Sequence, residues 1–471
     1  MQTLHRIEKD FLGEKEIPLD KYYGIQTLRA KENFYITKTD ISLFPNFIKS
    51  LARVKKACAL TNFELGDLSD AQRDAIVQAC NEIIDGKFHD QFIVDPIQGG
   101  AGTSTNMNAN EVIANRALEI MGKPKSAYEF IHPNNHINMS QSTNDVYPTA
   151  IKLTLHELIY KLKDSLRFLR DCFEEKSIEF KDVLKMGRTQ LQDAVPMTLG
   201  QEFKTYAVMI DEDIYRLRDA QTLLKEVNLG ATAIGTGINS KASYQRKVIS
   251  NLREVTGVDY VAAGDLIEAT QDTGAFVHIS GILKRVAIKV SKICNDLRLL
   301  SSGPRAGFNE INLPPMQPGS SIMPGKVNPV IPEVVNQVAF EVIGADTTIS
   351  IACEGGQLQL NVFEPIIAYK LFTSINMMRR AFYTLGEKCV KGITANEEVC
   401  MNNILNSVTL VTCLNPILGY EKSSAIAKEA LATNKRVYDL ILEQELFTKE
   451  ELDELLKPEN MVNNLMKETT K

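Results

Sequence analysis

Four short segments rich in glycine, hydroxyl and amide residues interrupt the apolar patterns of the chain. They span residues 99–108 (GGAGTSTNMN), 140–145 (SQSTND), 187–193 (GRTQLQD) and 319–329 (GSSIMPGKVNP). Glycine allows the backbone to approach a ligand closely, and hydroxyl and amide groups can donate hydrogen bonds to carboxylate oxygens. An ordinary connecting loop would explain the first segment equally well. The four segments are therefore candidates for the binding of a small anionic substrate.

The segment 319–329 is the most informative of the four. Its two glycines and two prolines with adjacent serines describe a mobile loop, and Lys326 and Asn328 follow. Lys326 provides a compact positive charge for a carboxylate. Ser320 and Ser321 have no histidine near them in the sequence, so a hydrolase triad is not indicated.

The second and third segments contain neutral hydrogen-bonding groups. Residues 140–145 precede a predicted long helix, where hydroxyls and helix-terminal N–H groups can bind an anion together. A simple helix cap explains Ser142 or Thr143 singly but not the whole run. In the third segment Thr189 and Gln190 are suited to orienting an amine or a carboxylate. Arg188 is either a substrate contact or a structural ion-pair partner.

Other motifs argue against cofactors. The stretch 230–237 (GATAIGTG) is neither a Walker loop nor a GxGxxG element after a strand, so nucleotide binding is not expected. His132 and His136 flank a Pro-Asn-Asn turn, and loop structure is favoured over a metal pair. The eight cysteines are scattered without zinc spacing and are expected to be reduced and mostly buried. No cofactor is required, although a divalent cation could modulate activity.

Long helices must position these segments. Apolar residues recur every three or four positions from Phe276 to Leu300, which predicts one helix over about Asp265–Ser302 that ends at Gly303-Pro304. Further long helices are predicted over residues 149–182, 198–227, 333–351 and 365–390. Such lengths favour a mainly α fold with a central long-helix bundle, packed across subunits as well. Short alternating pairs near Phe34–Thr37 are candidates for a hairpin.

Length and charge set the remaining limits. The 471 residues predict three parts: an N-terminal helical domain (1–140), the bundle (141–395) and a small C-terminal helical domain (396–471). The formal charge of −6 argues against a nucleic-acid or basic membrane-surface protein. The first residues lack a secretory pattern, and no apolar run approaches the ~20 residues that span a bilayer. We therefore expect a cytoplasmic protein.

At the four segments the sequence resembles the aspartase/fumarase superfamily. GSSIMPGKVNP is the most specific motif of that superfamily, and the resemblance extends from RIEKDFLGEKEIP near the start to GITANEE before the tail. It implies a three-domain homotetramer with a twenty-helix central bundle and active sites shared by three subunits. GGAGTSTNMN, QSTND and GRTQLQDAVP are closer to the ammonia-lyase branch than to fumarases, which typically show GSGTQSNMN, QSSND and RTHLQDATP.

The resemblance also implies a reaction. It is the reversible removal of ammonia from L-aspartate to give fumarate, by proton abstraction at C3 through an aci-carboxylate. Ser320 is implied as the base, with Ser321 beside it. The implied substrate-binding residues are Thr103, Ser142 and Thr143 for the β-carboxylate, Lys326 and Asn328 for the α-carboxylate, and Asn144, Thr189 and Gln190 for the amine.

Gln190 stands where fumarases and some aspartases have histidine. Hydroxide is a poor leaving group that benefits from proton donation, whereas ammonia departs as a neutral molecule from a protonated amine. A glutamine cannot usefully donate a proton at neutral pH, so it suits an ammonia-lyase better. The alternatives are a fumarate hydratase and a catalytically silent structural protein, because related scaffolds serve as lens proteins. The intact set of Ser320, Lys326 and Asn328 argues against the silent protein.

Overall fold

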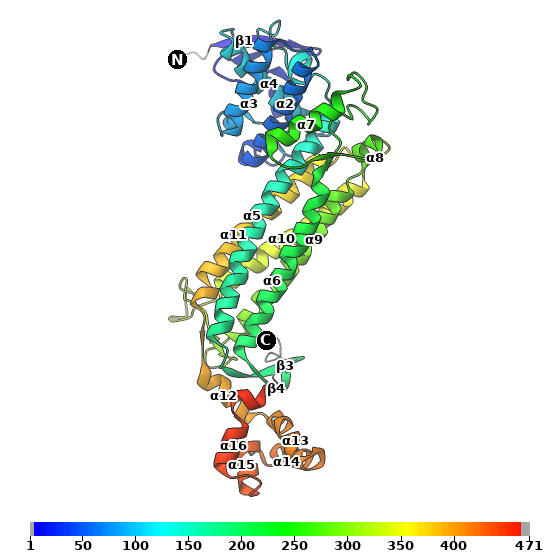
Figure 1. Ribbon diagram of the computed structural model, residues 1–471. Helices are drawn as coiled ribbons and strands as arrows, with labels where there is room; N and C mark the ends of the chain where they lie inside the picture. Colours follow the sequence, from blue (N-terminus) through cyan, green and yellow to red (C-terminus); the bar gives the residue numbers. More distant parts are fainter. Residues whose placement is uncertain (1–3, 463–471) are drawn as a thin grey trace. The chain divides into compact units, whose positions relative to one another are not determined.

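The computed structural model describes residues 4–462, and helices dominate it (Figure 1). The five longest helices are α5 (Thr143–Glu179), α6 (Leu199–Gln221), α9 (Gly274–Leu300), α10 (Val330–Glu354) and α11 (Glu364–Lys388). Their apolar positions recur with helical spacing, which is why the sequence predicted long helices in these regions. The mainly α fold class is therefore confirmed.

The remaining helices are shorter. They are α1 (Ile25–Asn33), α2 (Pro45–Glu64), α3 (Asp70–Ile84), α4 (Thr103–Ile120), α7 (Tyr244–Thr256), α8 (Leu266–Gln271), α12 (Glu397–Asn406), α13 (Asn415–Leu418), α14 (Tyr420–Thr433), α15 (Val437–Glu443), α16 (Lys449–Leu455) and α17 (Pro458–Met461). Within residues 4–462 no helix is long and apolar enough to cross a membrane.

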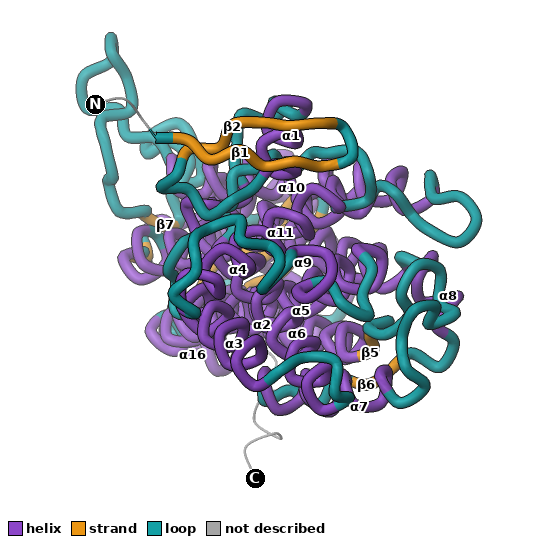
Figure 2. The backbone as a smooth tube through the Cα atoms, turned by 90° about the horizontal axis from the view of Figure 1, so that it is seen from above, coloured by secondary structure: helices purple, strands orange, loops and turns teal. Residues whose placement is uncertain are grey.

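Within residues 4–462 the strands form small two-stranded ladders, of which Figure 2 labels β1 with β2 and β5 with β6. Three ladders are antiparallel and one is parallel. The antiparallel pairs are β1 (His5–Asp10) with β2 (Gly13–Pro18), β3 (Leu184–Thr189) with β4 (Gln192–Thr198), and β7 (Ile311–Asn312) with β8 (Thr394–Ala395), and the parallel pair is β5 (Glu226–Val227) with β6 (Val261–Ala262).

Two structural predictions were wrong. The helix predicted over Asp265–Ser302 is broken after Gln271, and α9 begins only at Gly274. The backbone turns to an extended conformation at Asp272 (φ −77°, ψ 135°), which ends α8. The Asp272 carboxylate accepts a hydrogen bond from the N–H of Gly274, the first residue of α9, at 2.9 Å. The stop at Gly303-Pro304 is confirmed, since α9 ends at Leu300.

The hairpin predicted near Phe34–Thr37 does not form. The backbone N–H groups of Ile36 and Thr37 donate instead to the buried carboxylate of Asp95, at 3.0 and 2.7 Å. A distant side chain therefore satisfies the donors that a partner strand would have satisfied. The periodicity of the segment itself carries no sign of Asp95.

The chain forms two compact units, each made of discontinuous segments. The first contains residues 1–163, 215–285 and 341–377, and the second contains residues 164–214, 286–340 and 378–471. In the first unit α2 packs against α3 and α7. In the second unit the β3–β4 ladder packs against α12, and a separate apolar cluster holds the C-terminal helices together. The division at residues 140 and 395 stays a prediction.

The cysteines match their predicted state. All eight thiols are free, and six of them are buried. Burial among apolar side chains raises the pKa of Cys58 and Cys80 to about 12, so both stay protonated near neutral pH.

Candidate active site

The first polar segment lies in the first unit and leads directly into α4. Gly102 has a φ of +90°, and a Cβ on it would lie 2.6 Å from the ring of Tyr147. Only glycine therefore allows this segment to approach α5 so closely. Thr103 is exposed, and its hydroxyl donates to the Gly100 carbonyl oxygen at 2.7 Å. Thr103 must release that bond before its proton can bind a ligand.

The second polar segment forms the start of α5 in the same unit. Ser142 Oγ accepts a hydrogen bond from the Asn144 N–H at 3.2 Å, and Thr143 Oγ1 accepts one from Asn106 Nδ2 at 3.1 Å. Because both hydroxyl oxygens act as acceptors, their own protons are available to a ligand. The Asn106–Thr143 bond also joins the first turns of α4 and α5, so the first two predicted segments come together.

Asn144, predicted to orient the substrate amine, is held by its side chain. Asn144 Nδ2 donates to the Ala233 carbonyl oxygen at 2.7 Å, and Asn228 Nδ2 donates to the Asn144 carbonyl oxygen at 3.0 Å. The first contact orients the side-chain amide of Asn144 and leaves its Oδ1 atom as a candidate acceptor for an ammonium group, while the second holds its backbone.

The glycine-rich stretch 230–237 supports the second segment, a role that the sequence did not reveal. The Asp145 carboxylate is fully buried and accepts hydrogen bonds from the N–H groups of Ser142, Gly230 and Thr232, each at 3.0 Å. The spacing of Ser142 and Asp145 is that of a capping box, which could have indicated the first of these bonds. The bonds to Gly230 and Thr232 are long-range contacts without a sequence signal.

Burial raises the pKa of Asp145 to about 6, and the three N–H donors oppose that shift. The positive charge of Lys55 nearby lowers the same pKa. Near neutral pH this carboxylate is therefore ionised. An ionised carboxylate is a stronger acceptor for the three N–H donors than a protonated one.

The third polar segment is the β3–β4 hairpin of the second unit. Thr189 pairs with Gln192, which leaves Gln190 and Leu191 as a two-residue turn with φ values of 54° and 62°. Such a turn favours Asn-Gly, because a left-handed conformation costs roughly 1–2 kcal/mol in other residues. Thr189 and Gln190 are both exposed at this tip. The hairpin thus presents the two predicted neutral hydrogen-bonding groups side by side.

Charged residues anchor the base of this hairpin. Glu310 is fully buried and forms ion pairs with Arg188 at 2.7 Å and with Lys185 at 2.9 Å. The Arg188 guanidinium also lies 4.5 Å from the ring centroid of Phe308, within the range of a cation–π contact. The interpretation of Arg188 as a structural ion-pair partner is therefore confirmed.

The fourth polar segment forms a loop that is closed at its base. The Gly319 N–H donates to the Lys326 carbonyl oxygen at 2.8 Å, and Asn328 Nδ2 donates to the Gly319 carbonyl oxygen at 2.7 Å. A Cβ on residue 319 would lie 2.7 Å from the Lys326 carbonyl oxygen, so this closure requires glycine. Asn328 therefore uses one amide proton within the loop and keeps the second.

The hydroxyl of Ser320 is held by two hydrogen bonds within this loop. Its Oγ accepts hydrogen bonds from the backbone N–H groups of Ile322 at 3.2 Å and Met323 at 3.0 Å. Ser321 and Lys326 are exposed. Ser320, Met323 and Lys326 line a common cavity of about 460 Å³ within the second unit. Hydrogen bonds to the oxygen favour the ionised form of a hydroxyl, and a neighbouring ammonium group favours it further.

The predicted site residues thus form two groups. Thr103, Ser142, Thr143 and Asn144 belong to the first unit, whereas Thr189, Gln190, Ser320, Ser321, Lys326 and Asn328 belong to the second.

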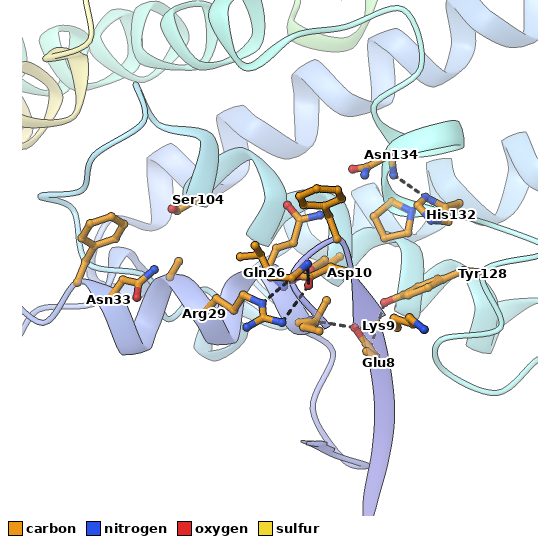
Figure 3. Close-up of a pocket in the computed structure, with 17 residues that line it drawn as sticks. Glu8, Lys9, Asp10, Gln26, Arg29, Asn33, Ser104, Tyr128, His132 and Asn134 are labelled. Carbon is orange, nitrogen blue, oxygen red and sulfur yellow. Dashed lines mark hydrogen bonds and ion pairs between the residues drawn. The ribbon is translucent and has the colours of Figure 1, made fainter. Parts of the chain in front are cut away.

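A second cavity, of about 480 Å³, lies in the first unit beside Ser104 (Figure 3). Asp10 and Arg29 are joined across it by two hydrogen bonds of 2.8 and 2.9 Å. His132, on the wall of the cavity, accepts the Asn134 N–H at Nδ1, at 3.0 Å. Ser104 is the residue of the first polar segment that lines this cavity.

The two histidines of the Pro-Asn-Asn turn have structural roles. His136 Nδ1 accepts the His132 N–H at 2.8 Å, so each ring uses Nδ1 within the turn and carries its proton on Nε2. Burial lowers the pKa of both rings. Across residues 4–462 no group of three or more histidine, cysteine, aspartate or glutamate side chains could hold a metal ion.

Comparison with known proteins defines the class. Residues 13–344 match the family described as Lyase, and residues 410–463 match the Fumarase C C-terminus family. A fumarate lyase:delta crystallin structure from Brucella melitensis, bound to cobalt, has a TM-score of 0.94 and 53% identity, covering 97% of this chain and 99% of that chain. The class II fumarase from Schistosoma mansoni has a TM-score of 0.91 and 35% identity, covering 97% and 98%. The chain therefore belongs to this lyase family, with its aspartase/fumarase-type fold.

The curated relatives narrow the class further. Aspartate ammonia-lyase of Helicobacter pylori (strain ATCC 700392 / 26695) is 62% identical over 97% of this chain and 98% of its own length. The aspartate ammonia-lyases of Pseudomonas aeruginosa and Escherichia coli (strain K12) are 59% and 54% identical, covering 97% of this chain and 97% and 96% of their own lengths. The predicted membership of the ammonia-lyase branch is confirmed.

Proposed function

We propose that this carbon–nitrogen lyase converts L-aspartate reversibly to fumarate and ammonia, with Ser320 as the base. The observation that carries the proposal is the pair of backbone N–H groups directed at Ser320 Oγ. A serine hydroxyl is too weak an acid to ionise unaided near pH 7. The two donors and the ammonium group of Lys326 in the same cavity supply the stabilisation that an alkoxide needs.

The first chemical step is proton abstraction. The Ser320 alkoxide takes the proton from C3 of aspartate, and the electron pair of the C–H bond moves into the adjacent carboxylate. The product of this step is an aci-carboxylate with an additional negative charge. In the second step the electrons return to form the C2–C3 double bond, and the C2–N bond breaks. Ammonia takes the electron pair of that bond, so no acid is needed for its departure.

Neutral donors stabilise the charge that develops on the β-carboxylate. Ser142 and Thr143 have hydroxyl protons available, because both oxygens already accept a hydrogen bond. Their bonds to the carboxylate strengthen as negative charge accumulates, which favours the transition state over the bound substrate. Thr103 joins them when it releases the Gly100 carbonyl oxygen.

The remaining groups bind the rest of the substrate. Lys326 and the second amide proton of Asn328 bind the α-carboxylate, while Asn144, Thr189 and Gln190 orient the ammonium group. Lys326 and Ser321 are exposed in this structure. Closure of the 319–329 loop over the substrate would bury both and exclude water, which strengthens every electrostatic contact in the site.

We further propose a cytoplasmic homotetramer whose active sites combine loops from three subunits. Helix α10 supports an assembly, because Phe340 and Ile351, which lie on one face of the helix, are 61% and 66% exposed. A helix that is apolar on an exposed face is typical of a subunit interface. We also propose that a divalent cation can modulate the activity without being a required cofactor, and the cobalt bound in the structure of a family member supports the presence of a cation.

The experiment that tests the activity compares two substrates. The purified protein is incubated with L-aspartate and, separately, with L-malate, and the appearance of fumarate is followed by its ultraviolet absorbance. We expect fumarate from aspartate. Rapid formation from malate alone would identify a fumarate hydratase instead. Absence of turnover with any amino or hydroxy diacid would support a structural protein.

A further inference from the structure

A buried lysine contacts two residues that shortly precede Thr143 in the chain. Lys55 of α2 is 1% exposed, and its Nζ donates to Asn138 Oδ1 at 3.0 Å and to Gln141 Oε1 at 2.8 Å. An ammonium group has donors and no acceptor, so the atoms that face it must be acceptors. Lys55 therefore fixes the Asn138 amide with its oxygen inward, independently of how the amide atoms are assigned.

The opposite ends of both amides agree with this orientation. Gln141 Nε2 donates to the carbonyl oxygens of Ile137 and Met139, at 2.9 and 3.0 Å, and Asn138 Nδ2 donates to the Gln141 carbonyl oxygen at 3.3 Å. Backbone carbonyls only accept. Each amide is thus held between a group that can only donate and groups that can only accept, so neither can reverse.

Two asparagines of α4 donate hydrogen bonds to the Asn138 side-chain oxygen. Asn106 and Asn110, one helical turn apart and both buried, each donate Nδ2 to Asn138 Oδ1, at 3.1 and 3.2 Å. Asn106 Nδ2 also donates to Thr143 Oγ1 at 3.1 Å. A reversed Asn106 amide would place oxygen against oxygen at Asn138. The nitrogen of Asn106 must therefore face Thr143.

This orientation is kept at a cost. The Oδ1 atoms of Asn106 and Asn110 are buried without a hydrogen bond to any residue that the structure describes. A buried acceptor left without a hydrogen bond lowers the stability of the fold. In this orientation the Asn106 nitrogen faces Thr143 Oγ1.

We infer that Asn106, held in place by Asn138 and Lys55, is a positioning residue that makes Thr143 a hydrogen-bond donor toward the substrate. A hydroxyl that accepts on one side turns its own proton to the other, and only a donor binds a carboxylate favourably. Thr103 shows the contrast, because its proton is engaged by Gly100. The inference rests on the proposed function, which assigns Thr143 to the β-carboxylate.

The test compares two asparagines that share the same network. Asn106→Asp keeps the shape but replaces the donor with an acceptor, so Thr143 turns its proton inward. Asn110→Asp makes the same change beside the same Asn138 oxygen without contact to Thr143. We expect Asn106→Asp to lower kcat/KM for L-aspartate about 10- to 100-fold more than Asn110→Asp, the worth of one hydrogen bond to a charged group. Most of the loss should appear in kcat.

Equal losses in the two variants would overturn the inference, since they would show a general effect of a buried carboxylate. A thermal unfolding curve and the assembled mass of each variant separate activity from folding. If Asn106→Asp does not fold, Asn106→Ala and Asn110→Ala provide the same comparison. A smaller excess loss, of about 3- to 10-fold, is then expected, because Thr143 becomes free to rotate rather than reversed. Equal losses again overturn the inference.

A double-mutant cycle distinguishes this inference from the proposed function. In a Thr143→Val background, Asn106→Asp should cost no more than Asn110→Asp, because no hydroxyl remains to be oriented. The same excess loss with and without the hydroxyl would overturn the positioning role and leave the proposed function standing. An unchanged kcat/KM in Thr143→Val alone would remove Thr143 from the substrate site, and the inference would fail with that assignment.

Discussion

Glu310→Gln offers a quantitative test of how the second unit holds the β3–β4 hairpin. The change removes a buried charge at nearly constant shape, beneath the strand that ends at Thr189. Arg188 loses its 2.7 Å ion pair, while Lys185 retains Glu202 at 2.6 Å. Removing one partner of a buried pair typically costs about 3–5 kcal/mol. Because Lys185 keeps a carboxylate and Arg188 keeps Phe308, we expect the low end, about 3 kcal/mol.

The assay is thermal unfolding together with steady-state kinetics. About 3 kcal/mol corresponds to a Tm lower by roughly 6–12 °C in domains of this size, at 2–4 °C per kcal/mol. KM for L-aspartate should rise as well, because the tip that carries Gln190 is less firmly held. Glu202→Gln is the matched control, since it removes the other carboxylate from Lys185 and leaves the Arg188–Glu310 pair intact. On the same scale, a difference of less than about 2 °C between the Tm values of Glu310→Gln and Glu202→Gln would show that Glu310 does not anchor the hairpin.

Three further outcomes are expected. Ser320→Ala should lower kcat by at least about 100-fold, the scale of general-base catalysis, while the assembled mass is unchanged; near-normal turnover would reject Ser320 as the base. Lys326→Ala should raise KM for L-aspartate by about 10-fold or more, for the loss of a charged hydrogen bond, and an unchanged KM would reject its carboxylate contact. Burial lowers the pKa of Lys55 from 10.5 to about 8, beside the Asp145 carboxylate and the Cys58 thiol. Between these pH values the unfolded chain binds the additional proton, so wild-type stability rises with pH there. The stability of the wild type relative to Lys55→Met should therefore improve by up to about 3 kcal/mol from pH 8 to pH 10.5 (about 2.5 units at 1.36 kcal/mol each). Denaturant melts across this range measure the difference, and a constant gap would contradict the assigned shift.

The parts of the fold that sequence predicts are those encoded locally. The helical spacing of apolar residues from Phe276 to Leu300 predicted the body of α9, because each of these side chains faces the same side of one helix. The break at Asp272 was missed because a carboxylate that bonds to the backbone two residues further on looks, in the sequence, like any polar residue inside a helix. Local pattern thus predicts that a helix exists better than it predicts where the helix begins.

The same difference between local and long-range signals applies to the candidate site. The hydroxyls of Ser142 and Ser320 stand out in the sequence because they lie in unusual runs of donors and glycine. Asp145 and Lys55 do not, since their roles depend on partners far along the chain, such as Gly230 for the carboxylate and Asn138 for the ammonium. A lysine in an amphipathic helix is ordinarily a surface residue. Only the folded chain shows that Lys55 is buried.

The hydrogen bonds at the base of the 319–329 loop have a consequence for how the loop can move. The chain enters at Gly319 and leaves at Asn328 through neighbouring atoms, and Ser320 takes its N–H donors from inside the segment. A movement of the segment about its base would therefore carry Ser320 and its two N–H donors together. The serine oxygen can then keep both hydrogen bonds while the loop moves over a substrate.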